Sequence, residues 1–94
     1  MSEVINNDNE IKIVHEPEQN RVAAYIGKLE VGRLTYEVED FSWIVDHTFV
    51  YKKFRGMKIA RKLVDEAVER AEEEGVTIVP VCPYVQKVLE MKGK

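Results

Sequence analysis

Hydrophobic residues alternate with polar ones over the first half of the chain, as in β-strands that bury one face. This pattern predicts strands over residues 11–15, 21–27, 29–39 and 41–50. The alternation changes phase near Gly32, where we expect a β-bulge. Short polar turns join the segments, so the pattern favours an antiparallel meander.

After Gly56 the hydrophobic residues recur at the spacing of an α-helix. The pattern predicts a helix over residues 57–74 that ends at Gly75, because glycine readily adopts the left-handed conformation that closes a helix. A short apolar strand over 76–82 follows, and Pro83 begins a last, short helix over 83–94. The order strand, helix, strand predicts a right-handed crossover between two parallel strands, and hence a mixed sheet of the α+β class.

The composition is that of one ordinary globular domain spanning residues 1–94, with 1–10 expected as a loose tail. No apolar run approaches the roughly 20 residues of a membrane span, and the polar N-terminus is unlike a signal peptide. The single cysteine, Cys82, cannot form an internal disulfide, so we expect a cytoplasmic protein without membrane association. His15, His47 and Cys82 lack the spacing of zinc ligands, and no metal is expected.

Positive charge is concentrated in residues 51–62, YKKFRGMKIARK, although the formal net charge of the chain is −3. A solvated basic face is the ordinary explanation of such a run. Here, however, the cations lie at the start of the predicted helix and Glu72–Glu74 at its end, the reverse of what the helix dipole favours. A polyanion bound at the helix N-terminus would resolve this conflict, and Gly56 would let the backbone come close to it. The cations of the stretch are Lys52, Lys53, Arg55, Lys58, Arg61 and Lys62.

The segment VYKKFRGMKIARKLVDEAVERA resembles the cofactor-binding motif of the GNAT superfamily of acyl-CoA-dependent N-acetyltransferases. That motif reads Arg/Gln-x-x-Gly-x-Gly/Ala between a strand and a helix. Arg55, Gly56 and Ala60 match it, whereas Lys58 stands at the position of the central glycine. The segments IVDHTFV and VPVCPYVQKVLE resemble the short single-domain branch of the superfamily, in which a Cys-Pro-Tyr element follows the strand after the cofactor helix. The resemblance covers about residues 21–91.

The resemblance implies a GNAT-like mixed sheet and an N-acetyltransferase that uses acetyl-CoA as cosubstrate. The pantetheine arm of acetyl-CoA would lie between the two parallel strands, beside the backbone of Thr48, Phe49 and Val50. The pyrophosphate would be held at the start of the long helix. The residues implied there are Arg55, Gly56, Met57, Lys58, Ile59, Ala60 and Arg61.

Transfer of an acetyl group to an amine requires a neutral amine and a proton donor for the leaving thiolate. Cys82 would cap the last helix, where a thiol has a lowered pKa. It could accept the acetyl group, line the thioester pocket, or be a small buried hydrophobe. Tyr84 could donate a proton to the CoA sulfur or pack on the pantetheine.

His47 is the natural candidate for the base that deprotonates the amine. Regular strand alternation, however, would place it on the apolar face of Trp43 and Phe49, as a core histidine. Asp46, on the opposite face, is the alternative base.

Three functions compete for this sequence. The first is the N-acetyltransferase, acting on a small amine or on a lysine of a protein; acidic residues such as Glu37 would suit a cationic acceptor. The second is a non-catalytic acyl-CoA-binding or protein-interaction module with the same fold. The third, a nucleic-acid binder, is disfavoured because the remaining charge is acidic and no nucleic-acid motif is present. The sequence carries no signal for an oligomeric state.

Overall fold

The structure is a computed structural model that describes residues 10–92. The tail expected over residues 1–10 therefore lies almost wholly outside the described residues, as do the last two positions of the predicted final helix. The elements in chain order are β1 (Ile11–Glu16), the 3-10 turn η1 (Pro17–Gln19), β2 (Arg21–Ile26), β3 (Leu29–Glu39), β4 (Ser42–Val50), the 3-10 turn η2 (Lys52–Phe54), α2 (Ile59–Glu74), β5 (Thr77–Pro80) and α3 (Pro83–Lys92).

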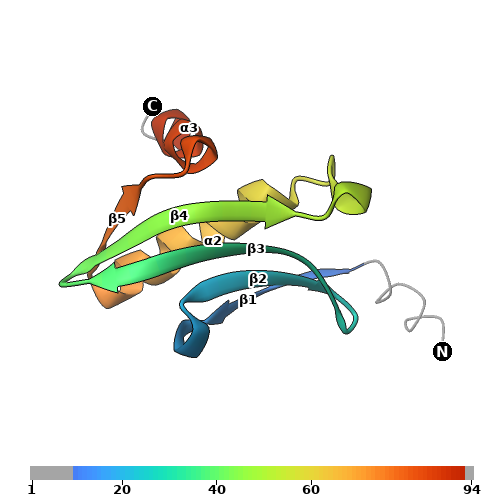
Figure 1. Ribbon diagram of the computed structural model, residues 1–94, viewed down its shortest axis with the longest axis horizontal. Coiled ribbons are helices and arrows are strands. Elements are labelled where there is room, and N and C mark those ends of the chain that lie inside the picture. The colour runs from blue at the N-terminus through green and yellow to red at the C-terminus, as the bar shows by residue number, and fades with distance from the viewer. Residues whose placement is uncertain (1–9, 93–94) are drawn as a thin grey trace.

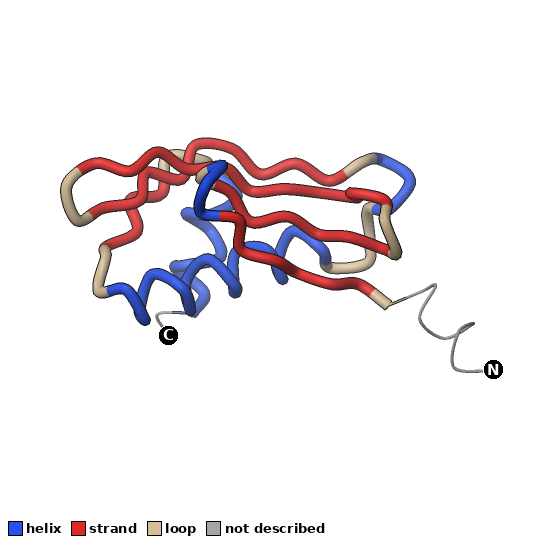
Figure 2. Tube along the Cα trace, turned by 90° about the horizontal axis from the view of Figure 1, so that it is seen from below, coloured by secondary structure: helices blue, strands red, loops and turns tan. Residues whose placement is uncertain are grey.

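The strands form one sheet in the order β1-β2-β3-β4-β5 (Figure 1). The first four are antiparallel neighbours, and β5 pairs with β4 in parallel. α2 makes the crossover between the two parallel strands, and both α-helices lie on one side of the sheet (Figure 2). The predicted meander followed by a strand–helix–strand crossover is therefore confirmed. Within residues 10–92, no helix is long and apolar enough to cross a bilayer.

The hydrophobic core lies between the sheet and the two helices. Leu34 and Val45 of the sheet and Leu63 of α2 are completely buried, and Val85 of α3 is nearly so. At its C-terminal end α2 is closed by Gly75, whose φ of 72° is left-handed, as the sequence predicts. The periodic pattern of apolar residues thus accounts for which faces are buried.

Two predicted boundaries are wrong by a few residues. α2 begins at Ile59 rather than at 57, because Lys58 adopts the left-handed conformation with φ 64° and cannot belong to a right-handed helix. β5 covers Thr77–Pro80 rather than 76–82, because the chain leaves the sheet after Pro80.

The sheet contains two irregularities of register. The first leaves Val31 without a partner in β2, next to Gly32, which confirms the bulge expected there. The second was not expected: Thr35 pairs with His47 and Tyr36 with Val45, so Asp46 is an extra residue in β4.

The bulge at Asp46 exchanges the two faces of β4. Trp43 and Val45 are buried before the bulge, and Val50 is buried after it, five residues on from Val45 instead of four or six. His47 is therefore exposed rather than buried with Trp43. The interpretation of His47 as a core histidine is wrong, because it assumed an uninterrupted alternation.

Candidate functional site

β4 and β5 separate halfway along β4 (Figure 1). Their pairing ends where Val45 lies beside Pro80. The amides of Val81 and Cys82 then both donate to the carbonyl oxygen of Val45, at 3.0 and 3.1 Å, as the chain turns toward α3. β4 continues to Val50 without a β5 partner. The last five residues of β4 consequently have no β5 partner on the side of α3, where the backbone of Thr48 hydrogen-bonds the thiol of Cys82.

A cavity of about 480 Å³ lies at this end of β4. The strand contributes one wall, the turn before α2 and its first residues contribute another, and α3 contributes a tyrosine. The lining residues are Thr48, Phe49, Val50, Phe54, Arg55, Gly56, Lys58, Ile59, Ala60 and Tyr84. The structure thus brings together most of the residues implied for cofactor binding, while Met57 and Arg61 are not part of the lining.

The start of α2 supplies backbone donors to this region. The first hydrogen bond of the helix runs from the amide of Lys62 to the carbonyl of Lys58, at 3.1 Å, and the amide of Arg55 donates to Lys52 at 3.2 Å. Within residues 10–92, no backbone carbonyl accepts a hydrogen bond from the amides of residues 56–61. Such unpaired amides at a helix N-terminus bind anions.

Gly56 and Lys58 give this turn its shape. Gly56 has φ 91°, a conformation that side chains rarely adopt, and a Cβ added to it would meet no atom within 4 Å. The backbone conformation alone therefore requires a glycine at position 56, whether or not a ligand approaches the backbone there. Lys58 has φ 64° without being glycine, which explains why the related motif places a glycine there.

The cations around the turn are held in different ways. Arg55 donates from Nε to the carbonyl oxygen of Val50 at 3.1 Å, which ties its guanidinium to the end of β4. Arg61 forms an ion pair with Asp65, at 3.4 Å. In the part of the chain that the structure describes, the other cations of residues 51–62 have no carboxylate partner within 4.0 Å. The region therefore keeps an excess of positive charge beside unpaired amides.

Cys82 lies across the gap from β4. Its carbonyl accepts the first hydrogen bond of α3, from Gln86 at 3.1 Å, so Cys82 is the N-cap residue as expected. Its Sγ lies 3.8 Å from Oγ1 of Thr48. Burial raises the pKa of the thiol, but hydrogen bonds with the amide of Val85, the hydroxyl of Thr48 and the amides of Tyr84 and Thr48 outweigh it, and the pKa is lowered.

The other two catalytic candidates occupy different positions. Tyr84 lines the cavity and is 39% exposed. His47 is exposed and lies beside Phe49, with ring centroids 6.3 Å apart, and it does not line the cavity. The alternative base, Asp46, accepts a hydrogen bond from Thr35 at 2.9 Å. Cys82 and Tyr84 therefore stand at the gap, whereas His47 is farther along the open face.

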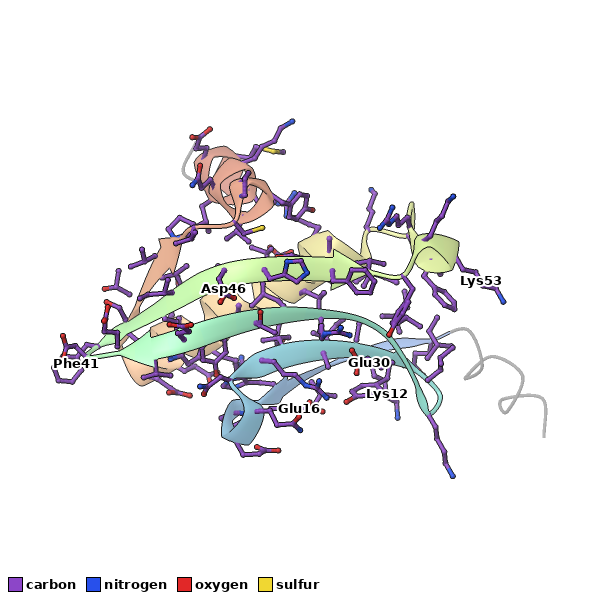
Figure 3. The ribbon with its side chains drawn as sticks, viewed as in Figure 1. Lys12, Glu16, Glu30, Phe41, Asp46 and Lys53 are labelled. Atoms are coloured by element: carbon purple, nitrogen blue, oxygen red, sulfur yellow. The ribbon has the colours of Figure 1, made fainter. Side chains whose placement is uncertain are left out.

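The face of the sheet opposite α2 carries a network of charged and aromatic side chains. Arg33 donates to Glu30 at 2.7 Å and lies over the ring of Phe49, with its Cζ 5.2 Å from the centroid. Glu30 also pairs with Arg21. Figure 3 shows Asp46 and Glu30 projecting on this face, which α2 and α3 leave uncovered.

The fold and its motif are shared with known proteins. Residues 21–94 match the protein family described as GCN5-related N-acetyl-transferase, which is most of the chain. The chain belongs to this family. The resemblance found in the motif around Arg55 is thereby confirmed.

Solved structures of GCN5-related N-acetyltransferases have the same fold. A GCN5-like putative N-acetyltransferase from Staphylococcus aureus is 26% identical, with a TM-score of 0.65 over 90% of this chain and 81% of that one. A ribosomal-protein-alanine N-acetyltransferase from Brucella melitensis biovar Abortus 2308 is also 26% identical, with a TM-score of 0.61 over 76% of this chain. The chain spans 58% of the length of that protein.

A third structure shows the fold alone. The PaiA N-acetyltransferase from Thermoplasma acidophilum, solved in complex with coenzyme A, is 13% identical, with a TM-score of 0.56 over 80% of this chain and 43% of that one. A comparison with curated proteins gives no match. Members of the family use acetyl-CoA as cosubstrate, so the chain has the fold and the motif of an acetyl-CoA site.

Sequence reasoning missed one residue of this GCN5-related site. Phe54 lines the cavity and packs against the core, while Nζ of Lys53 lies 5.9 Å from the centroid of its ring. An aromatic residue in the middle of a basic run was the available signal, because a solvated basic face has no need of one. Phe54 anchors the turn that carries the cations.

Proposed function

We propose that this protein binds acetyl-CoA at the gap between β4 and β5 and transfers the acetyl group to an amine. One observation carries the proposal. In a chain of the GCN5-related family, one cavity joins the part of β4 that β5 does not pair with to the amides and excess cations at the start of α2. Acetyl-CoA has the complementary shape and chemistry, since it carries phosphates at one end and an amide-bearing arm at the other.

The two walls of the cavity would hold different parts of the cosubstrate. The backbone of Thr48, Phe49 and Val50 would pair with the amides of the pantetheine arm, as an added strand pairs with a sheet edge. The amides of residues 56–61 and the side chain of Arg55 would hold the pyrophosphate. The thioester would then lie near the point where the two strands separate, between Thr48 and Cys82.

Two routes of transfer are consistent with this arrangement. In direct transfer the neutral amine attacks the thioester carbonyl, the carbon–sulfur bond to CoA breaks, and the amine proton passes to a base. In the second route the thiolate of Cys82 attacks first, which forms an acetyl-cysteine and releases CoA as a thiolate that takes up a proton. The amine then attacks the acetyl-cysteine, the carbon–sulfur bond to Cys82 breaks and regenerates the thiolate, and the amine proton passes to a base.

Tyr84 is proposed as the donor of the proton to the leaving CoA sulfur, because it lines the cavity on the α3 side. His47 is proposed as the base that deprotonates the amine, reached from the open face of the sheet. Asp46 is the alternative to His47, since it lies closer to the point of separation but already accepts a hydrogen bond from Thr35.

Calorimetric titration with acetyl-CoA, with CoA and ATP as comparisons, tests the binding part of the proposal. Micromolar affinity for acetyl-CoA and CoA, with much weaker binding of ATP, is the expected result. Equal affinity for all three ligands would indicate a general polyanion site. Absence of binding would refute the proposed function.

Mass spectrometry of the intact protein after incubation with acetyl-CoA distinguishes the routes. A gain of one acetyl group that is absent in Cys82→Ala would support the acetyl-cysteine route. No gain, together with acetylation of an added amine, would support direct transfer. Binding without a mass gain and without acetylation of any amine in a screen of small amines and lysine peptides would favour the non-catalytic acyl-CoA-binding module.

A further inference from the structure

Lys58 occupies a backbone position that is unfavourable for lysine. Its φ of 64° and ψ of 24° are left-handed, and no side-chain hydrogen bond caps the helix at this residue. A residue with a Cβ is disfavoured in this conformation, whereas glycine is not. The residue nevertheless lines the cavity, directly before the first turn of α2.

The charge of Lys58 is also uncompensated. Within residues 10–92 no carboxylate lies within 4.0 Å of its ammonium group, and the residue is exposed. Among the six cations of residues 51–62, only Arg55 and Lys58 line the cavity. Nε of Arg55 donates to the carbonyl oxygen of Val50. Of the two cations that line the cavity, Lys58 is therefore the one whose charged group has no partner among the described residues.

We propose that Lys58 is a phosphate-binding residue of the acyl-CoA site and that its charge binds a phosphate in addition to the backbone amides of the turn. This inference rests on the proposed function. A lysine is a flexible point charge, so it can reach a phosphate oxygen from the turn without leaving its backbone position. The conformational cost of a side chain at this position is then offset when an anion binds.

The test is titration of CoA into four variants under low and high salt. Lys58→Gly removes the charge and the backbone strain, Lys58→Asn removes the charge while tolerating the left-handed conformation, and Lys58→Arg retains the charge. Lys12→Gln is the matched control, because Lys12 is an exposed lysine on the opposite edge strand β1 (Figure 3).

Lys58→Gly and Lys58→Asn should each raise the Kd for CoA about fivefold at low salt, as for a solvent-exposed ion pair. The difference from the wild type should shrink at high salt, since exposed charges are screened. Lys58→Arg and Lys12→Gln should bind as the wild type does. Lys58→Gly should also melt about 4 °C higher, which shows that the loss of affinity is not a loss of folding.

Wild-type affinity in both Lys58→Gly and Lys58→Asn would overturn the inference while leaving the proposed function intact. Absence of CoA binding by the wild type would overturn both. Titration of dephospho-CoA, which lacks the 3′-phosphate, into the same variants then identifies which phosphate Lys58 contacts. A loss on substitution that is the same for CoA and dephospho-CoA assigns Lys58 to the pyrophosphate, and a loss seen only with CoA assigns it to the 3′-phosphate.

Discussion

Gly32 faces the end of β4 so closely that an added methyl group has no space. A Cβ on Gly32 would lie 2.9 Å from the carbonyl oxygen of Phe49, 3.2 Å from Cγ2 of Val50 and 3.4 Å from Cγ2 of Ile59. The nearest of these atoms belongs to the backbone, which cannot rotate away as the tip of a side chain can. We therefore predict that Gly32→Ala displaces β4 at the end that borders the cavity.

Overpacking of this kind costs about 1–3 kcal/mol. For a domain of this size, about 2 kcal/mol corresponds to a fall in Tm of roughly 8–16 °C. The free energy of unfolding is measured by urea denaturation followed by circular dichroism, and affinity for CoA is measured in the same variant. Because Phe49 and Val50 line the cavity, CoA binding should weaken along with stability.

Gly27→Ala is the control for the general effect of replacing a glycine. Gly27 has φ 62°, and a Cβ added to it would meet no atom within 4 Å, so its substitution strains only the backbone. We expect a smaller cost, about 1 kcal/mol, and unchanged CoA affinity. A Gly32→Ala variant as stable as the wild type, with normal CoA binding, would refute the packing argument.

Three further predictions concern individual side chains. Arg55→Ala should weaken CoA binding about tenfold, because it removes a cation held at the cavity; unchanged affinity by calorimetry would contradict the anion site. Cys82 should be alkylated by iodoacetamide at lower pH than a free thiol, because its pKa is lowered in the folded state; a pH profile equal to that of free cysteine would be inconsistent with this environment. Burial, with the charges of Glu74 and Glu18, raises the pKa of Tyr36 to about 12. Since an unfolded tyrosine has a pKa of about 10, stability should be intact below that pH and fall as pH rises toward about 12. Urea unfolding across this range should show a smaller fall in Tyr36→Phe, and an equal fall would contradict the assignment.

Elements of the fold could be predicted because their signals are local. The helical period over residues 59–74, the glycine at 75 and the proline at 83 each act on neighbouring backbone. The bulge at Asp46 could not be predicted in the same way. It is defined by how Thr35 and Tyr36 of another strand pair with β4, and the sequence IVDHTFV gives no local sign of a break in the strand.

The site was predictable to the extent that it follows a continuous motif. Arg55, Gly56 and Ala60 stand where the motif requires them, and all three line the cavity. The contribution of Phe54 depends on packing against a distant part of the core, and the left-handed conformation of Lys58 is hidden by the absence of glycine. The packing of Phe54 depends on long-range contacts that the spacing of residues does not encode.

The extra residue in β4, Asp46, affects how the strand diverges from β5 and not which of its residues are buried. Without Asp46, Val45 and Val50 would be four positions apart, so ordinary alternation would still bury both and leave His47 and Phe49 on the open face. The core therefore gains nothing from the bulge. What the bulge adds is a bend in the strand, at the position where β5 departs. A chain shortened by this one residue would keep its buried faces, yet its straighter β4 would stay alongside β5 for longer and narrow the space proposed for the cosubstrate.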